Sequence, residues 1–143
     1  MKKNIMFLCT GNSCRSQMAE GFCRKYWGEN FNVFSAGTKK HGMNPRAMKV
    51  MEEAGVDISS HFSKTTEELP DFTFDYVITV CDSAKENCPY FPGGKIIHVG
   101  FEDPPALTKE MSDEDEILSV YRRVRDEIEE AIKKLPSILE EKK

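Results

Sequence analysis

The feature that most constrains this chain is a short loop between a buried strand and a helix. Residues 4–9 (NIMFLC) form a continuous apolar run, which is typical of a strand covered on both faces of a parallel sheet. From Cys14 onward the apolar residues recur at helical spacing, so the loop must connect the two. Gly11 and Asn12 can both adopt left-handed backbone angles, which a tight loop at this place requires.

The rest of the chain continues to alternate between strands and helices. Further strands are expected at residues 31–36, 74–80 and 95–99. Helices are expected from Cys14 to Gly28, from Pro45 (capped by Asn44) to Gly55, a short turn at 66–69, and a last helix, capped by Ser112, with an apolar stripe from Ile117 to Leu135.

This alternation predicts an α/β fold in one domain, residues 1–143, with a four-stranded parallel sheet and helices on both faces. A chain of this length buries enough surface to form its own core. In such sheets ligands bind beyond the carboxyl ends of the strands, where the strand order reverses. Those ends fall at Cys9 to Arg15, Val80 to Asp82, and Gly100 to Asp103.

The first of these ends carries residues suited to binding an oxyanion. Successive backbone N–H groups of the loop can turn inward, and the helix N-terminus and Arg15 add positive charge. The same field favours the thiolate form of Cys9, and Ser16 can donate a hydrogen bond to it. The alternative is a buried cysteine at a strand end beside a solvated arginine.

Charge and cysteine content exclude several other classes. With 20 Lys and Arg against 24 Asp and Glu the net charge is −4, which argues against a nucleic-acid-binding protein. The apolar run at 5–9 is too short for a signal peptide or a membrane span, so a cytoplasmic protein without membrane contact is expected. Five cysteines in a reducing compartment predict reactive, metal-bound or buried thiols. The three histidines are scattered, so no metal site is expected.

Residues 9–21, CTGNSCRSQMAEG, resemble the signature loop of the low-molecular-weight protein tyrosine phosphatase superfamily. Within it the chain is most similar to the thioredoxin-coupled arsenate reductases. The likeness extends to residues 35–45, 80–89, 100–104 and 122–128. Phosphatases of the superfamily usually have Pro where this chain has Gln17.

The resemblance implies a role for each residue of the site. Cys9 is the nucleophile and Asp103 the general acid, and Cys81 and Cys88 carry a disulfide relay that thioredoxin or a similar dithiol resets. The oxyanion-binding loop consists of Thr10, Gly11, Asn12, Ser13, Cys14, Arg15 and Ser16. Asn12, Glu20 and Ser35 brace that loop. The electrons come from cysteine, so no organic cofactor is expected.

The two later cysteines raise a geometric question. If residues 82–87 were helical, the Cα atoms of Cys81 and Cys88 would lie about 10.5 Å apart. A disulfide tolerates about 7 Å at most. We therefore expect residues 81–92 to rearrange on oxidation. The alternatives are a buried strand-end cysteine at 81 and a loop cysteine at 88.

Two other functions fit parts of the pattern. A phosphatase acting on aryl or small phosphate esters needs only Cys9, Arg15 and Asp103. The sequence PAL at residues 105–107 argues against a phosphatase, because phosphatases of the superfamily commonly have aromatic residues at these positions. A non-catalytic oxyanion or arsenite sensor could use the same cysteines.

The remaining residues with possible chemistry are assigned structural roles. We expect Cys14 to be secondary, Cys23 to lie in the core, and His41, His61 and His98 to be structural. Some relatives hold an alkali cation near the position of His61, where this chain has Phe62 and Lys64. A monomer is the default expectation.

Overall fold

A four-stranded parallel sheet forms the centre of the protein, as the sequence pattern predicts. The computed structural model describes residues 2–39, 42–69, 74–81 and 95–141. The strands are β1 (Lys3–Cys9), β2 (Phe31–Gly37), β3 (Tyr76–Thr79) and β4 (Lys95–His98), in the order β2-β1-β3-β4. Because β1 has a hydrogen-bonded neighbour on each side and is covered on both faces, its apolar run is unbroken.

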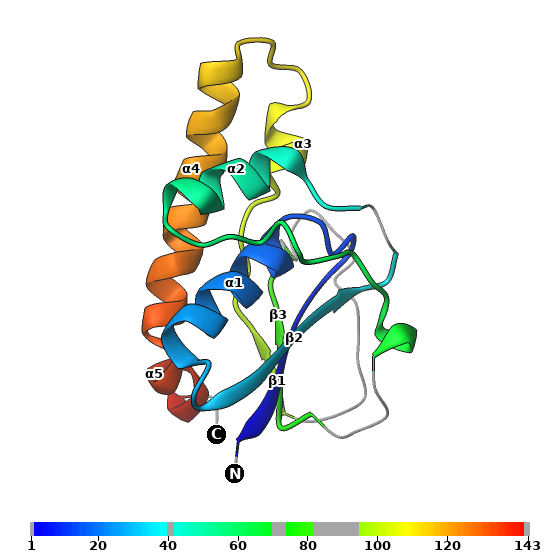
Figure 1. Cartoon of the computed structure of the whole chain (residues 1–143), viewed down its shortest axis with the longest axis vertical. Coiled ribbons are helices and arrows are strands. Elements are labelled where there is room, and N and C mark those ends of the chain that lie inside the picture. Colours follow the sequence, from blue (N-terminus) through cyan, green and yellow to red (C-terminus); the bar gives the residue numbers. More distant parts are fainter. Residues whose placement is uncertain (1, 40–41, 70–73, 82–94, 142–143) are drawn as a thin grey trace.

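Helical segments lie on both sides of this sheet. They are α1 (Arg15–Trp27), α2 (Pro45–Glu53), the 3-10 helix η1 (Thr66–Glu68), α3 (Pro104–Thr108), α4 (Glu114–Lys133) and α5 (Leu135–Glu141). Figure 1 shows α1, α2 and α4 gathered on one side, with η1 on the other.

The two sides of the sheet bury two separate apolar clusters. Phe7 and Ile78 face the helices and belong to the larger cluster, together with Phe22 of α1 and Val124 of α4. The opposite face carries Met6, Leu8 and Val77, and Leu69, which follows η1, packs against them. Alternate residues of β1 thus enter opposite clusters, as the period of a strand requires.

The ends of the predicted helices are partly confirmed. The side chain of Asn44 accepts hydrogen bonds from the backbone N–H groups of Arg46 and Ala47, so it is the predicted N-cap of α2. The prediction that Ser112 caps α4 is wrong. Asp113 is the N-cap and accepts from the N–H of Asp115, because the chain enters the helix one residue later.

The predicted last helix is divided into α4 and α5 at Lys134. Pro136 has no N–H, so it cannot donate to the carbonyl of Ile132 four residues earlier. The indole Nε1 of Trp27 donates to that carbonyl instead, at 2.7 Å. The helix is therefore interrupted before α5, and the carbonyl of Ile132, which has lost its donor within the helix, accepts from Trp27 of α1.

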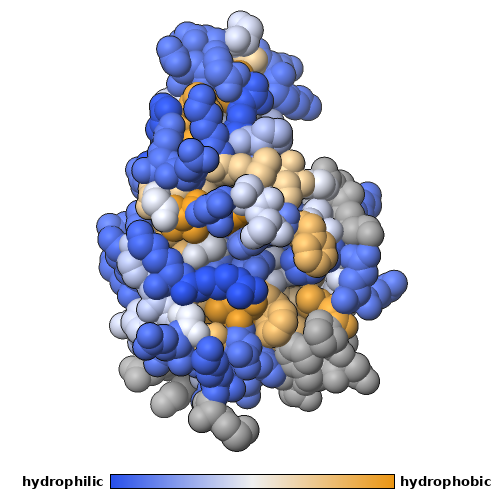
Figure 2. Space-filling model, in the orientation of Figure 1, coloured by the Kyte–Doolittle hydropathy of each residue, from blue (hydrophilic) through white to orange (hydrophobic). Residues whose placement is uncertain are grey.

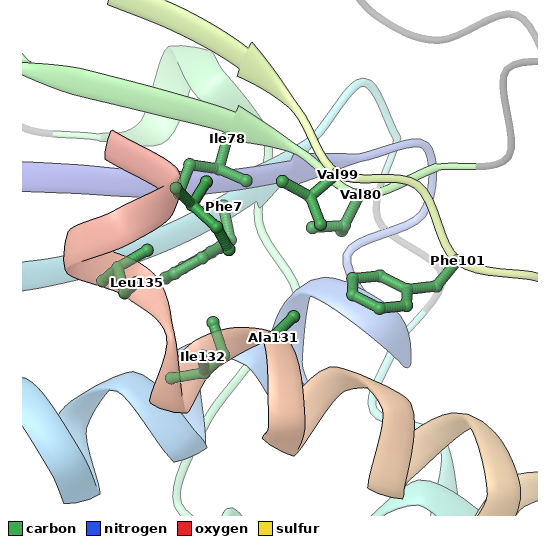
Figure 3. A pocket seen from close by; sticks show the side chains of 9 residues that line it. Phe7, Ile78, Val80, Val99, Phe101, Ala131, Ile132 and Leu135 are labelled. Atoms are coloured by element: carbon green, nitrogen blue, oxygen red, sulfur yellow. The ribbon is translucent and has the colours of Figure 1, made fainter. Parts of the chain in front are cut away.

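Where α4 and α5 meet the sheet, the core contains a small apolar cavity of about 10 Å³ (Figure 3). Phe7 and Ile78 approach it from the sheet, and Ile132 and Leu135 from the helices. A volume of this size is at the lower limit for one water molecule, and the lining offers that water no polar partner. The side chains around this cavity are therefore closely packed, and we expect shortening any one of them to lower the free energy of unfolding.

The face of the molecule in Figure 2 carries both hydrophilic and hydrophobic residues. Figure 2 shows hydrophilic residues over the upper helices, with hydrophobic residues between them. Among the described residues the large hydrophobic side chains that are exposed are Phe62 and Ile96. Single exposed apolar residues are ordinary on a soluble surface. In the same part of the chain, no helix has the length and apolar character to cross a bilayer.

Leu135→Ala tests whether α5 is an integral part of this core. Leu135 is 1 % exposed, so we expect the substitution to lower the free energy of unfolding by about 2–5 kcal/mol. The control is Ser137→Ala, an exposed position on the same helix, with an expected change within about 0.5 kcal/mol. Urea unfolding measures both, and equal small effects would mean that α5 is loosely attached.

Candidate functional site

Cys9 lies where the strand order of the sheet reverses. β1 pairs with β2 on one side and with β3 on the other, so the carboxyl ends of β1 and β3 lie side by side while the next strands, β2 and β4, lie on opposite sides of this pair. Doubly wound sheets bind their ligands at such a switch point. Cys9 ends β1, and the N–H of Val80 donates to the carbonyl of Leu8 beside it at 2.9 Å.

The loop after Cys9 is tight because Asn12 adopts the left-handed conformation, with φ of 48°. Its amide group is buried, and each of its four hydrogen-bonding positions has a partner. Oδ1 accepts from the N–H of Lys64 and from Nε2 of Gln17, at 2.9 and 3.0 Å. Nδ2 donates to the hydroxyls of Ser16 and Ser35, at 2.8 and 3.0 Å.

These partners fix the direction of the hydrogen bond to Cys9. The N–H of Lys64 can only donate, so the amide oxygen of Asn12 faces it and the NH₂ group faces Ser16. Ser16 thus accepts from Asn12, and its own proton points to the Sγ of Cys9, 3.0 Å away. The predicted donation from Ser16 to Cys9 agrees with this geometry.

Glu20 and Ser35 brace the loop from behind, as expected. The hydroxyl of Ser35 accepts from Asn12 and donates to a carboxylate oxygen of Glu20. Glu20 is 4 % exposed, and Nε of Arg24 donates to its other oxygen at 2.9 Å. The buried carboxylate therefore has a counter-charge one helical turn away.

Position 37, at the end of β2, must be glycine because the backbone of the loop packs directly against it. A Cβ at this position would lie 2.6 Å from the carbonyl oxygen of Thr10, which is closer than real contacts allow. Its N–H donates to the carbonyl of Lys64, and the next N–H, of Thr38, donates to Thr10. The end of β2 thus approaches the loop through its backbone alone.

Residues 61–64 cover the back of the loop, which sequence reasoning did not foresee. The hydroxyl of Ser63 donates to the carbonyl of Gly11 at 2.9 Å, and Gln17 donates to the carbonyl of Phe62 at 3.0 Å. The Nδ1 of His61 lies 3.0 Å from the Oε1 of Gln17. Burial lowers the pKa of His61, so its ring is neutral near neutral pH. The one feature of the sequence that could have indicated these contacts is Gln17, at the position where phosphatases of the superfamily usually have proline.

The loop faces a cavity of about 250 Å³. Its described lining consists of Cys9, Thr10, Gly11, Ser13, Cys14, Arg15, Asn44, Asp103 and Pro105. No aromatic side chain is among these residues. The cavity is thus large enough for a small tetrahedral oxyanion and has no described wall that would stack on a phenol ring.

Arg15 and Asp103 meet at this cavity. Arg15 is 3 % exposed, and its Nη1 donates to the carbonyl of Phe101 at 3.2 Å. Its Nη2 lies 3.6 Å from Oδ1 of Asp103, whose side chain is 30 % exposed. The structure therefore brings Asp103, which is far away in the sequence, to the loop that carries Cys9 and Arg15.

Asn44 is a wall residue that sequence reasoning treated only as a helix cap. Its N–H donates to the carbonyl of Ser13 at 3.2 Å, and its Nδ2 donates to the hydroxyl of Tyr121 at 3.1 Å. Asn44 thus ties the start of α2 to the loop and to α4. Its sequence context, an Asn before Pro, signals only the cap.

The cysteines differ in their chemical state. Cys9, Cys14 and Cys23 are free thiols, and all three are buried. Burial raises the pKa of Cys14, and it raises that of Cys23 to about 12, so both are protonated and poorly nucleophilic. Cys81, two residues after β3, is fully buried and disulfide-bonded.

Several expectations concern residues outside the described ranges. These are the position of Cys88, the rearrangement of residues 81–92 beyond Cys81, and the environment of His41. The remaining histidine, His98, is structural as expected, with its Nδ1 2.7 Å from the hydroxyl of Thr79. The described residues contain no cluster of three or more metal-ligating side chains.

Comparison with known proteins identifies the family. The model of the low molecular weight phosphotyrosine protein phosphatases matches residues 4–143. The chain belongs to this family. A curated relative from Bacillus licheniformis, named arsenate reductase, is 50% identical over 134 residues, which are 93% of this chain and 94% of the relative.

Solved structures agree with this membership. One described as an arsenate reductase in the reduced state has a TM-score of 0.73 at 33% identity, and covers 96% of this chain and 98% of that one. A thioredoxin-dependent arsenate reductase of Corynebacterium glutamicum has a TM-score of 0.62 at 28% identity. That match covers 94% of this chain and 62% of the other.

Ser16→Ala tests the hydrogen bond to Cys9. A hydrogen bond to a charged group contributes about 1.5–3 kcal/mol, so iodoacetamide alkylation of Cys9 at pH 7 should slow by roughly 10- to 100-fold. The rate at pH 10, where thiols ionise without help, should change little. Ser119→Ala, on the exposed face of α4, is the control and should match the wild type. An unchanged rate at pH 7 in Ser16→Ala would contradict the assigned donor.

Proposed function

We propose that the protein is an arsenate reductase that works through a cysteine relay. The observation that carries this proposal is the cavity in which Cys9, Arg15 and Asp103 converge, with Cys81 two residues after the neighbouring strand. The relatives named arsenate reductases support it.

The first step is attack of the Cys9 thiolate on arsenic. Arsenate sits in the loop, held by backbone N–H groups and the guanidinium of Arg15. As the sulfur–arsenic bond forms, an arsenic–oxygen bond breaks, and Asp103 protonates the oxygen, which leaves as water. Asp103 lines the same cavity and lies 3.6 Å from the guanidinium of Arg15, which supports its role as the acid.

In the second step the Cys81 thiolate attacks the sulfur of Cys9. The sulfur–arsenic bond breaks with its electron pair on arsenic, so arsenic(V) becomes arsenic(III) and leaves as arsenite. A Cys9–Cys81 disulfide remains. The sheet register supports this step: Leu8 pairs with Thr79, so Cys9 and Cys81 leave adjacent strands, and both belong to the same buried cluster.

In the third step Cys88 attacks Cys81 and returns Cys9 to the thiolate. Two electrons from thioredoxin or a similar dithiol then reduce the Cys81–Cys88 disulfide. A free Cys9 beside a disulfide-bonded Cys81 supports this order, because the relay ends in that pair of states. The thioredoxin-dependent relative also supports it. The relay requires no bound organic cofactor, and we propose that the protein acts as a monomer in the cytoplasm.

A phosphatase is the second candidate, because the family shares the chemistry of Cys9, Arg15 and Asp103. It accounts for neither Cys81 nor Cys88, and the described cavity lining lacks the aromatic residues that would hold a phenol ring. We therefore expect ester hydrolysis only as a residual activity. A sensor would bind arsenate or arsenite without consuming any thiol.

Cys88→Ser separates these functions. The variant should still release about one arsenite per chain, because Cys9 and Cys81 remain, but repeated turnover with a dithiol reductant should stop. Hydrolysis of an aryl phosphate should be unchanged. The control, Cys23→Ala, removes a buried thiol outside the relay and should retain both activities. Full turnover of arsenate by Cys88→Ser, or equal loss of both activities, would contradict the proposed relay.

A further inference from the structure

Gln17 occupies a place in the site that the proposed chemistry does not explain. It lies in the first turn of α1 and is completely buried, although its side chain is polar. Its Nε2 donates to the carbonyl of Phe62 at 3.0 Å, and to Oδ1 and the carbonyl of Asn12 at 3.0 and 3.2 Å. Its Oε1 lies 3.0 Å from Nδ1 of His61, so both groups of the amide are bonded and together they connect residues 61–64 with the loop.

The direction of these bonds can be assigned from their partners. The carbonyl oxygens of Phe62 and Asn12 only accept, so the NH₂ group of Gln17 faces them and its Oε1 faces His61. The Nδ1 of His61 consequently carries the proton and donates to Gln17. The tautomer of His61 thus follows from the backbone around it.

A single directional chain results when these bonds are joined to those of the loop. His61 donates to Gln17, Gln17 to Asn12, Asn12 to Ser16, and Ser16 to Cys9, at 3.0, 3.0, 2.8 and 3.0 Å. Every donor in the chain points toward the sulfur. In a buried site each bond polarises the next, so such a chain stabilises negative charge at its end.

We infer that Gln17 is a positioning residue for Cys9. Together with the N–H of Lys64, it holds the amide of Asn12 in the orientation that leaves the Ser16 hydroxyl free to donate to the thiolate. This inference rests on the proposed role of Cys9 as the nucleophile. Gln17 itself touches neither the cavity lining nor the reacting sulfur, so its effect passes through Asn12 and Ser16.

Without Gln17 two restraints on Asn12 are lost together. The carbonyl and Oδ1 of Asn12 each lose a donor, and the carbonyl of Phe62 loses its tie to α1. Asn12 is held in a left-handed conformation that its own backbone disfavours, so it can then relax. The hydroxyl of Ser16 can then rotate, because Asn12 no longer fixes the direction in which it donates. Proline at position 17 could supply none of these bonds.

The test compares Gln17→Met with the wild type in the reduced full-length protein. Methionine has a similar length and good helix propensity but cannot donate a hydrogen bond. Alkylation of Cys9 by iodoacetamide is measured at pH 7 and pH 10 and mapped by peptide mass. We expect the ratio of the two rates, pH 7 over pH 10, to fall about 5- to 20-fold in Gln17→Met. Met18→Leu, a buried neighbour without polar atoms, is the control and should keep the wild-type ratio.

The double variant Ser16→Ala/Gln17→Met distinguishes positioning from a general loss of packing. If Gln17 acts through Ser16, the double variant has the same rate ratio as Ser16→Ala alone. The inference would be overturned if the fall in the double variant equalled the product of the falls in the two single variants. It would also be overturned if Gln17→Met kept the wild-type ratio. Should Gln17→Met fail to fold by circular dichroism, Gln17→Glu replaces it. This variant keeps an acceptor for His61 but, when ionised, has no donor for Asn12, so the same fall is expected.

The same data separate this inference from the proposed nucleophile. Glutathione, alkylated in parallel, provides the rate ratio of an ordinary thiol. If Cys9 of the wild type had the same pH 7 to pH 10 rate ratio as glutathione, the proposed thiolate would be contradicted, independently of the result for Gln17→Met. A wild-type ratio well above that of glutathione, unchanged by Gln17→Met, would overturn the inference alone.

Discussion

The amide of Asn12 is the contact on which the rest of the site depends. It satisfies four partners from three parts of the chain, the first turn of α1, β2 and residues 61–64, and it does so from a left-handed conformation that lets the loop turn tightly. Because one partner is a backbone N–H, the amide has a single possible orientation. That orientation decides which way the Ser16 and Ser35 hydroxyls donate, and so connects Cys9 with Glu20.

Around this contact the fold brings together side chains from several segments of the chain. The reversal of strand order places the ends of β1 and β3 side by side, so the buried Cys81 leaves the sheet next to Cys9. Arg15 is anchored to the chain after β4 by the carbonyl of Phe101, which also brings Asp103 to the cavity. The positions of Cys81 and Asp103 relative to Cys9 are consequently determined by sheet topology more than by local sequence.

Periodicity was enough to predict the parallel sheet and the main helices, and the family resemblance of the loop and of residues 100–104 predicted that Asp103 joins Cys9 and Arg15. The failures have local causes. Ser112 and Asp113 are both good caps, and only the path of the chain selects the second. The break before α5 follows from Pro136, and the carbonyl of Ile132 that it leaves without a helical donor accepts from Trp27, more than 100 residues away. Gln17 and residues 61–64 were missed because a buried polar contact across the fold leaves no periodic signal.

The account is tested most directly by mixing fully reduced protein with excess arsenate, without any external thiol. Arsenite and the remaining thiols are then counted, and the new disulfide is mapped by peptide mass. The relay predicts one arsenite released and two thiols lost per chain, with the bond between Cys81 and Cys88. No arsenite, with all five thiols intact and an aryl phosphate readily hydrolysed, would contradict it and leave a phosphatase with two incidental cysteines.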